Sequence, residues 1–172
     1  SIDPSITATG LALWLVGPDT PIRASLVATC VVVPNVRQLG ESWAGRINWI
    51  ITNWFRTEEY YASGDWRATW KGEGGGVLLN QCPHNLDLVW WLFGDPSRIR
   101  AFCSLGRYHD IEVEDDVTAY FEYPDGAKLV FITSTGEAPG TNRLEVTGER
   151  GKLVYEKDKL LFERNEVPMG EF

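Results

Sequence analysis

The chain has 172 residues with 24 acidic and 16 basic side chains, so its formal net charge at pH 7 is −8. This balance argues against a nucleic-acid partner, because neutralising phosphates requires clustered Lys and Arg. Apolar runs such as residues 11–16 are far shorter than the ~20 residues that span a bilayer, so no membrane partner is expected.

The three cysteines, Cys30, Cys82 and Cys103, are too few for a secreted disulfide scaffold and lack C-x-x-C spacing. We therefore expect reduced, partly buried thiols in a cytoplasmic protein. A chain of this length forms one domain that needs no disulfide to fold. We divide it into an unassigned amino-terminal segment, residues 1–36, and an α+β domain, residues 37–172.

Glycine and proline interrupt two apolar runs in the first segment, around 11–16 and 26–33. The second run, rich in Val, is compatible with a strand, and the first with a helix or a strand. Neither run carries G-x-G-x-x-G or GxxxxGK, the loops that bind nucleotide phosphates. We therefore expect no cofactor bound to this chain alone.

β-Branched and aromatic residues dominate residues 46–55, which predicts a strand whose end presents Asn53. Residues 57–71 have no clean period, and we expect a binding loop with a short helix over 58–62. Trp66 and Arg67 lie in the middle of this loop. Arg67 either covers an indole face at the surface or contacts a ligand. We name Asn53, Trp66 and Arg67 as candidate substrate contacts.

Residues 72–94, GEGGGVLLNQCPHNLDLVWWLFG, predict a helix introduced by glycines and stopped at Gly94. At about 3.6 residues per turn, Asn80, His84 and Asp87 share one polar stripe. Pro83 lacks an N–H, so the helix either kinks near 83 or begins there, and in the second case the pairing of Asn80 with His84 fails. We interpret Asp87 as structural. The predicted core stripe comprises Leu86, Val89, Trp90 and Phe93.

From residue 98 onward, apolar and polar residues alternate. This pattern predicts strands over 98–108, 113–123, 127–135, 143–147, 152–156 and 160–164. Short connections favour antiparallel neighbours, so we predict a meander. Because the helices precede the strands, the predicted fold class is α+β: an open, mostly antiparallel β-sheet with helices packed on one face. The other face, with Tyr120, is expected to pair with a second copy in a homodimer or higher homo-oligomer.

The polar residues between the first two of these strands suggest no metal site. One histidine, His109, with dispersed carboxylates is a weak ligand set, so we predict a solvated turn at His109 and Asp110. The acidic residues beside it are interpreted as a solvated strand edge: Glu112, Glu114, Asp115 and Asp116.

Three stretches resemble, in the right order, the carboxy-terminal half of the glucose-fructose oxidoreductase and inositol dehydrogenase family (Gfo/Idh/MocA). They are residues 72–94, VEDDVTAYFEYPDGA (113–127) and LEVTGERGKLV (144–154), and the resemblance covers about residues 45–166. Members of that family join a Rossmann domain to an α+β domain with an open sheet. They oxidise or reduce sugars, inositols and related polyols with NAD or NADP.

The resemblance also implies site residues. The family's glycine-led helix carries an acidic residue and, four positions on, a histidine, which correspond here to Asn80 and His84. His84 would be the catalytic acid-base, taking the hydroxyl proton of the substrate. Asn80 departs from the acidic type: an amide can bind a sugar hydroxyl but cannot hold charge.

The family's glycine fingerprint and its catalytic lysine in Glu-Lys-Pro belong to the Rossmann half. This sequence has neither, since its first lysine, Lys71, is followed by glycine. We therefore expect a separated half, from a deletion, a truncated chain or a disrupted reading frame, which binds substrate and oligomerises but is inactive alone. The alternative is a non-catalytic binding or oligomerisation module derived from the same family.

Overall fold

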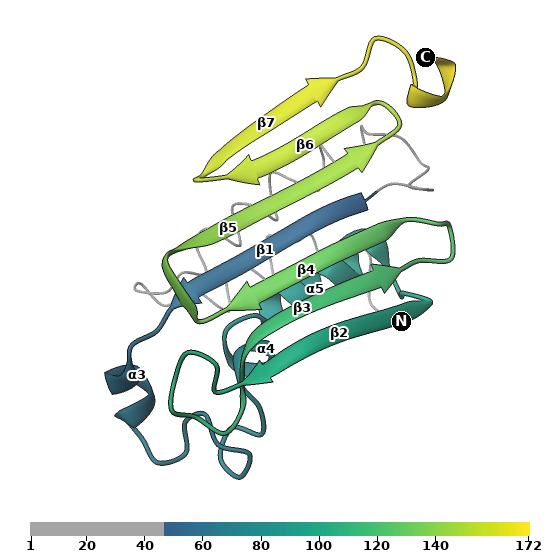
Figure 1. Cartoon of the computed structure of the whole chain (residues 1–172). Helices are drawn as coiled ribbons and strands as arrows, with labels where there is room; N and C mark the ends of the chain where they lie inside the picture. Colours follow the sequence, from purple (N-terminus) through teal and green to yellow (C-terminus); the bar gives the residue numbers. More distant parts are fainter. Residues whose placement is uncertain (1–46) are drawn as a thin grey trace, which may run out of the picture.

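The computed structural model describes residues 47–172, so the predictions for residues 1–36 and Cys30 lie outside the described part. One seven-stranded sheet forms its body, in the order β2-β3-β4-β1-β5-β6-β7 (Figure 1). The strands are β1 (Ile47–Phe55), β2 (Arg98–Leu105), β3 (Glu114–Glu122), β4 (Lys128–Ser134), β5 (Gly136–Gly148), β6 (Gly151–Glu156) and β7 (Lys159–Arg164). The helices are α3 (Glu58–Ala62), α4 (Val77–Asn80), α5 (Pro83–Phe93) and the 3-10 turn η2 (Met169–Glu171).

The predicted fold class is confirmed. Helices α4 and α5 lie together on one face of the sheet, and the opposite face is free of the described helices (Figure 1). Of the six neighbouring strand pairs, β1 with β4 is parallel and the rest are antiparallel. No helix among residues 47–172 is long and apolar enough to cross a membrane.

The predicted meander is wrong at one place. Strand β1 lies between β4 and β5, pairing with both, so these two strands do not pair with each other. The chain passes from β4 to β5 around the end of β1, where the Arg56 N–H donates to the Thr135 carbonyl at 2.9 Å. Because β1 offers a free edge to pair with, β5 starts at Gly136 and not near residue 143.

The core lies between the helices and the covered face of the sheet. Val89 of α5 and the adjacent Cys82 pack there with alternate residues of the strands, including Ile50, Phe131 and Leu144. Burial raises the pKa of the Cys82 thiol to about 12, so this thiol stays protonated at neutral pH.

The helix of residues 72–94 is broken before Pro83. Helix α4 ends at Asn80, and α5 begins at Pro83, the first helical position, where a missing N–H costs nothing. Of the predicted core stripe, Val89 is buried, but Trp90 is 58% exposed and its indole N–H donates to Asp95. Trp90 was wrongly assigned to the core, because the buried face of α5 is centred on Leu88 and Val89, with Leu86 and Phe93 partly buried against the core.

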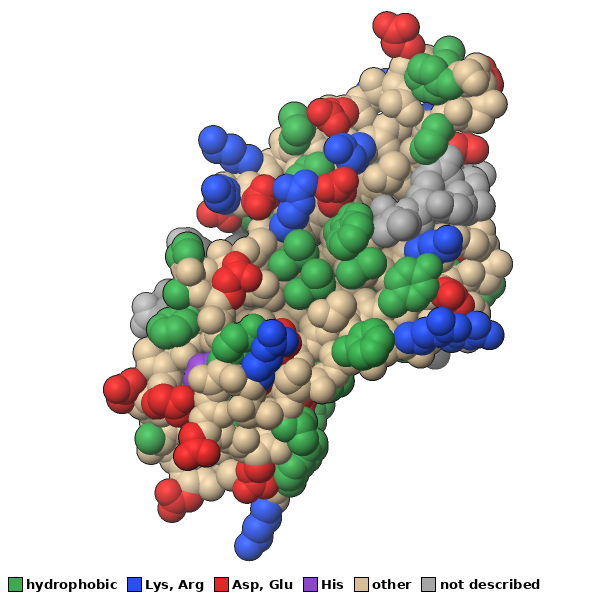
Figure 2. Space-filling model, viewed as in Figure 1, with side chains coloured by type: hydrophobic (Ala, Val, Ile, Leu, Met, Phe, Trp, Pro, Cys, Tyr) green, Lys and Arg blue, Asp and Glu red, His purple; other side chains and the backbone are tan. Residues whose placement is uncertain are grey.

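The face of the sheet opposite the helices, here called the open face, is apolar at its centre (Figure 2). Alternation places on this face the neighbours of the buried strand residues. The register aligns Tyr120, Val130 and Trp49 in one row, and Ile132 and Ile51 in the next. All five are partly or well exposed, so a continuous apolar surface runs across β3, β4 and β1.

Toward β7 the open face becomes charged. Arg143 of β5 pairs with Glu145 at 2.6 Å and with Glu156 of β6 at 2.8 Å. Lys152 lies within 4 Å of Glu145 and of Glu163 in β7. These exposed pairs contribute little stability one by one, but they balance the charges of Arg143 and Lys152 on this side of the apolar centre.

The buried hydroxyl group of one core tyrosine, Tyr123, lowers the stability of the fold by an amount that can be measured. The Tyr123 hydroxyl is buried and has no hydrogen-bond partner among the described residues. Desolvation, followed by the nearby Asp125 charge, raises the pKa of Tyr123 to about 12. The folded protein therefore binds more protons than the unfolded chain between pH 10 and 12, and its stability falls as pH rises through that range.

We predict that Tyr123→Phe increases the free energy of unfolding by about 1 kcal/mol at pH 7, because it removes an unsatisfied polar group and keeps the ring contact with Phe93. The advantage should widen between pH 10 and 12. Urea denaturation at several pH values measures both effects, with Tyr108→Phe at an exposed position as a neutral control. A less stable Tyr123→Phe variant at pH 7 would contradict this account.

Candidate functional site

A polar cluster joins α3, the following loop and α4, and Tyr60 lies at its centre. The Thr57 hydroxyl caps α3 by accepting from the Tyr60 N–H, which directs the Tyr60 ring toward α4. The phenol donates to Asn80 Oδ1 at 3.3 Å and accepts from Arg67 Nη1 at 3.2 Å. Gln81 Nε2 lies 3.5 Å from the same oxygen.

The Asn80 amide is hydrogen-bonded at both ends. Its oxygen accepts from Tyr60, and its Nδ2 donates to Glu73. The second oxygen of Glu73 accepts from the Ala68 N–H at 2.6 Å. Asn80 therefore lies in a chain of hydrogen bonds that ties α4 to the loop of residues 63–76.

Arg67 is stacked between two aromatic rings. Its guanidinium carbon lies 4.7 Å from the Tyr60 ring centre and 4.5 Å from the Trp66 ring centre. Ser63 and Tyr60 accept one hydrogen bond each, so three of its five N–H groups have no partner among the described residues. Trp66 is 52% exposed, so the outer face of this stack is open to a ligand.

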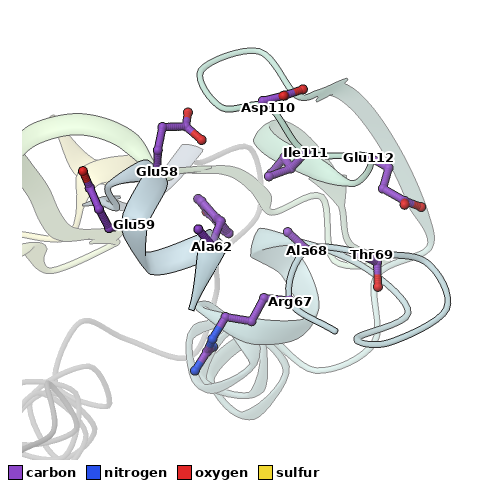
Figure 3. A pocket seen from close by; sticks show the side chains of 10 residues that line it. Glu58, Glu59, Ala62, Arg67, Ala68, Thr69, Asp110, Ile111 and Glu112 are labelled. Carbon is purple, nitrogen blue, oxygen red and sulfur yellow. The ribbon is translucent and has the colours of Figure 1, made fainter. Parts of the chain in front are cut away.

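An open cavity of about 710 Å³ lies beside this cluster (Figure 3). Its walls are α3, the loop of residues 67–69 and the loop of residues 110–112. Figure 3 shows the Arg67 side chain on the side of the cavity opposite Asp110. The acidic residues Glu58, Glu59, Asp110 and Glu112 are also among those that line it.

The structure does not bring all predicted site residues together. His84 is the second residue of α5, is exposed, and has no hydrogen-bond or ion-pair partner among residues 47–172. It does not line the cavity, and the break at Pro83 separates its helix from that of Asn80. The side-chain NH2 of Asn53 donates to Glu137 on β5, and the side-chain amide oxygen of Asn53 is buried. Of the predicted site residues, the catalytic candidate Asn80 and the candidate substrate contacts Trp66 and Arg67 share one cluster.

His109 and Asp115 are buried, so the predicted solvated turn is wrong at His109 and the predicted solvated strand edge is wrong at Asp115, whereas Asp110 and Glu112 are exposed as predicted. Asp115 is fully buried and His109 is 7% exposed. The Asp115 carboxylate accepts from the N–H groups of Arg107, Tyr108 and His109, at 2.8, 2.7 and 3.2 Å. Backbone donors satisfy the carboxylate, which is why an acidic residue can occupy the interior.

The imidazole of His109 extends this network to three more segments. Its Nδ1 lies 3.1 Å from Asp115, and its Nε2 lies 2.9 Å from the Arg56 carbonyl at the end of β1. Thr135, between β4 and β5, lies 3.4 Å from Nδ1 and accepts from the Tyr61 hydroxyl of α3 at 3.0 Å. Through Thr135 and Tyr61, the pair of His109 and Asp115 therefore holds α3 against the sheet.

Glu114, also assigned to the solvated edge, is buried too. One of its carboxylate oxygens accepts from the Gly76 and Leu78 N–H groups at the start of α4, at 2.9 and 3.2 Å. Gly76 must be glycine, because a Cβ there would lie 1.9 Å from the Glu114 carbonyl oxygen. The register shift opposite Ser104 and Leu105 is a β-bulge that lets two consecutive acidic side chains both reach buried donors.

The glycine-rich turn before α4 does not fit a phosphate group of a dinucleotide. The glycine-rich turn before α4 has the form of a phosphate site, but the Glu114 carboxylate already occupies its N–H groups and would repel a phosphate. Among residues 47–172, no three His, Cys, Asp or Glu side chains are grouped to hold a metal ion.

Sequence reasoning missed Tyr60, Glu73 and the burial of Asp115. The signal for Asp115 was weak but present. Three consecutive acidic residues directly follow a loop, and the backbone N–H groups of a loop can donate to a carboxylate. For Glu73 the signal was its place just before the glycine run that leads to Asn80.

A sequence model of the GFO/IDH/MocA C-terminal domain matches residues 37–154. Trans-1,2-dihydrobenzene-1,2-diol dehydrogenase from Bos taurus is 34% identical over 87 residues, which are 49% of this chain and 25% of that protein. The chain therefore spans only about a quarter of the length of this curated relative.

Solved structures share the fold. The WlbA dehydrogenase from Chromobacterium violaceum, determined with NADH and UDP-GlcNAcA, is 25% identical with a TM-score of 0.70, over 86% of this chain and 43% of that one. An inositol dehydrogenase homolog from Azotobacter vinelandii, determined with NAD+, is 20% identical with a TM-score of 0.65, over 84% and 39%. Less than half of each of these chains is matched.

We predict that Asp115→Ala lowers the free energy of unfolding by about 3–5 kcal/mol, because it leaves His109 and three buried N–H groups without an acceptor. Asp116→Ala, which removes only an ion pair with the exposed Arg107, should cost at most about 1 kcal/mol. Guanidinium chloride denaturation compares the two.

Asp115→Asn keeps one acceptor oxygen and should lie between these variants, so the series remains informative if Asp115→Ala does not fold. Equal losses at positions 115 and 116 would show that the buried network contributes no more than a surface ion pair.

Proposed function

The chain belongs to the GFO/IDH/MocA family through its C-terminal domain, and from this premise we propose that it is the substrate-binding and oligomerisation half of an NAD- or NADP-dependent oxidoreductase. The proposed substrate is a sugar, an inositol or a related polyol. Structural neighbours solved with NADH and UDP-GlcNAcA, or with NAD+, support this class. A cytoplasmic location is part of the proposal, supported by the free thiols of Cys82 and Cys103.

His84 is the proposed acid-base. Its ring is exposed on α5 and engages no other described side chain, so both nitrogens are available to a ligand. An imidazole changes protonation near neutral pH, which suits it to take the proton of a substrate hydroxyl during oxidation and to return it during reduction. The exposed His84 ring, with no partner among the described side chains, is the observation that best supports the proposal.

Arg67 and Trp66 are the proposed substrate contacts. The stacked guanidinium keeps three N–H groups for hydroxyl or anionic oxygens, and the exposed indole face can pack against a sugar ring. Asn53 is less available, because its amide is engaged by Glu137 and its oxygen is buried. The proposed hydride acceptor, NAD or NADP, would be bound by a Rossmann domain, because Glu114 already engages the N–H groups of the glycine-rich turn before α4.

The activity is tested by joining the chain to the dinucleotide-binding domain of a relative and replacing His84 by Ala. We predict that kcat falls by about 10²–10⁴-fold, the usual contribution of a positioned acid-base, while sugar binding is retained. Asp87→Ala, one turn further along α5, is the matched control and should keep its activity. An unchanged rate in the His84→Ala protein would favour the alternative, a non-catalytic binding or oligomerisation module.

The open face supports the second part of the proposal, a homodimer. Its centre of Trp49, Val130 and Ile132 is apolar, while the charges toward β7 are already paired within the chain. A surface that is apolar at its centre and polar at its rim is the anatomy of a protein interface. A second copy fits because a two-fold axis places the same apolar centre opposite itself.

We predict that the unchanged chain has a solution mass of twice 19.4 kDa or more, and that Ile132→Lys dissociates it. The lysine would bury an unpaired ammonium group at the centre of the interface. Size-exclusion chromatography with light scattering measures the mass. Leu79→Lys, an exposed apolar position on the helical side, is the control and should not change it. A monomeric unchanged chain would refute the dimer.

A further inference from the structure

The contact between Glu73 and Asn80 defines the orientation of the Asn80 amide. A carboxylate only accepts hydrogen bonds, so the group of Asn80 that faces Glu73 is the NH2. The amide oxygen then faces Tyr60, whose hydroxyl donates to it. Both ends of Asn80 are thus engaged by the protein, and little of this side chain is left for a ligand.

Glu73 itself is held from two sides but is not neutralised. Asn80 donates to one oxygen and the Ala68 N–H to the other. No Lys, Arg or His of the described residues lies within ion-pair distance of it. A carboxylate has about four lone-pair positions, so about two remain for other donors. The side chain is partly exposed, and a ligand can reach it.

We propose that Glu73 is the acidic residue of the substrate site and that Asn80 is a positioning residue that holds it. The carboxylate that the family resemblance leads one to expect at position 80 is supplied here from position 73. Its free lone pairs would accept hydrogen bonds from hydroxyl groups of a polyol. This inference rests on the proposed function, because it takes the ligand to be polyhydroxylated.

The pairing explains why position 80 carries an amide. An Asp there would place two carboxylates in contact, and like charges at that distance cannot both be ionised without a large cost. The charged and titratable groups near the pair are Tyr60 on α3, Arg67 stacked on its ring, and Glu114 of β3, which binds the first N–H groups of α4. The exposed Lys71 is two residues before Glu73 in the chain. Helix α4, with the sequence VLLN, contributes no charge.

The pairing is tested by exchanging the two groups in the full 172-residue chain. We expect Asn80→Asp to lower Tm by about 5 °C at pH 7.5, and to recover most of this loss at pH 5, where the two carboxylates can share a proton. The double variant Glu73→Gln with Asn80→Asp restores a donor–acceptor pair and should return Tm to within about 2 °C of the original at pH 7.5. Near-ultraviolet circular dichroism follows unfolding.

The ligand role is tested by binding of myo-inositol and D-glucose, followed by NMR of the tryptophan indole N–H signals. We expect Glu73→Gln to stay folded with a Tm lowered by about 5 °C, because its amide nitrogen faces one of the two donors, and to weaken binding about tenfold, the value of one hydrogen bond to a charged group. The double variant, which carries its carboxylate at position 80, should recover part of that affinity. Glu166→Gln, an exposed acid near the carboxyl end, is the control and should bind normally.

The outcomes separate this inference from the proposed function. Binding by Glu73→Gln that is as tight as in the unchanged chain would refute the role of Glu73 and leave the proposed function standing. Absence of binding of both probes to the unchanged chain would refute the proposed substrate class, and the ligand role of Glu73 with it. An Asn80→Asp variant of unchanged Tm would refute the pairing itself.

Discussion

Two consecutive buried carboxylates at the start of β3 hold together the segments around the candidate site. Glu114 binds the first N–H groups of α4, and Asp115 binds the loop before β3 together with His109. Through His109 the same network reaches the end of β1 and, through Thr135, the Tyr61 side chain of α3. Because an unsatisfied buried carboxylate is very costly, these donors must all be in place at once, and the surrounding loops have one arrangement.

The position of β1 makes this network possible. As the central strand it brings Arg56 next to the turn between β4 and β5, so residues far apart in the chain meet at one end of the sheet. The short helix α3 follows β1 directly, and its Tyr60 meets Asn80 of α4. The sheet therefore serves both proposed roles: one end supports the polar cluster, and the open face offers an apolar surface to a second copy.

Much of the fold could be predicted because its signals are local. Period-two alternation located β2 to β4, β6 and β7 to within a few residues, and the predicted helix over 58–62 is α3. The start of β5 and the central place of β1 could not be predicted, because strand order depends on pairings across most of the chain. Of the site, Arg67 stacked on Trp66 was one of two stated alternatives, whereas its second stack on Tyr60 needed coordinates.

The sequence by itself determined the fold class, the family and the residue types available for chemistry, because periodicity and motifs are properties of neighbouring residues. Only the tertiary structure decided which of those residues are free to contact a ligand. It buried Asp115 and His109, engaged both ends of Asn80, and left His84 exposed and unpaired among the described residues. The reason is that a polar side chain becomes structural when distant backbone donors or side chains satisfy it, and no local pattern reports where those partners will lie.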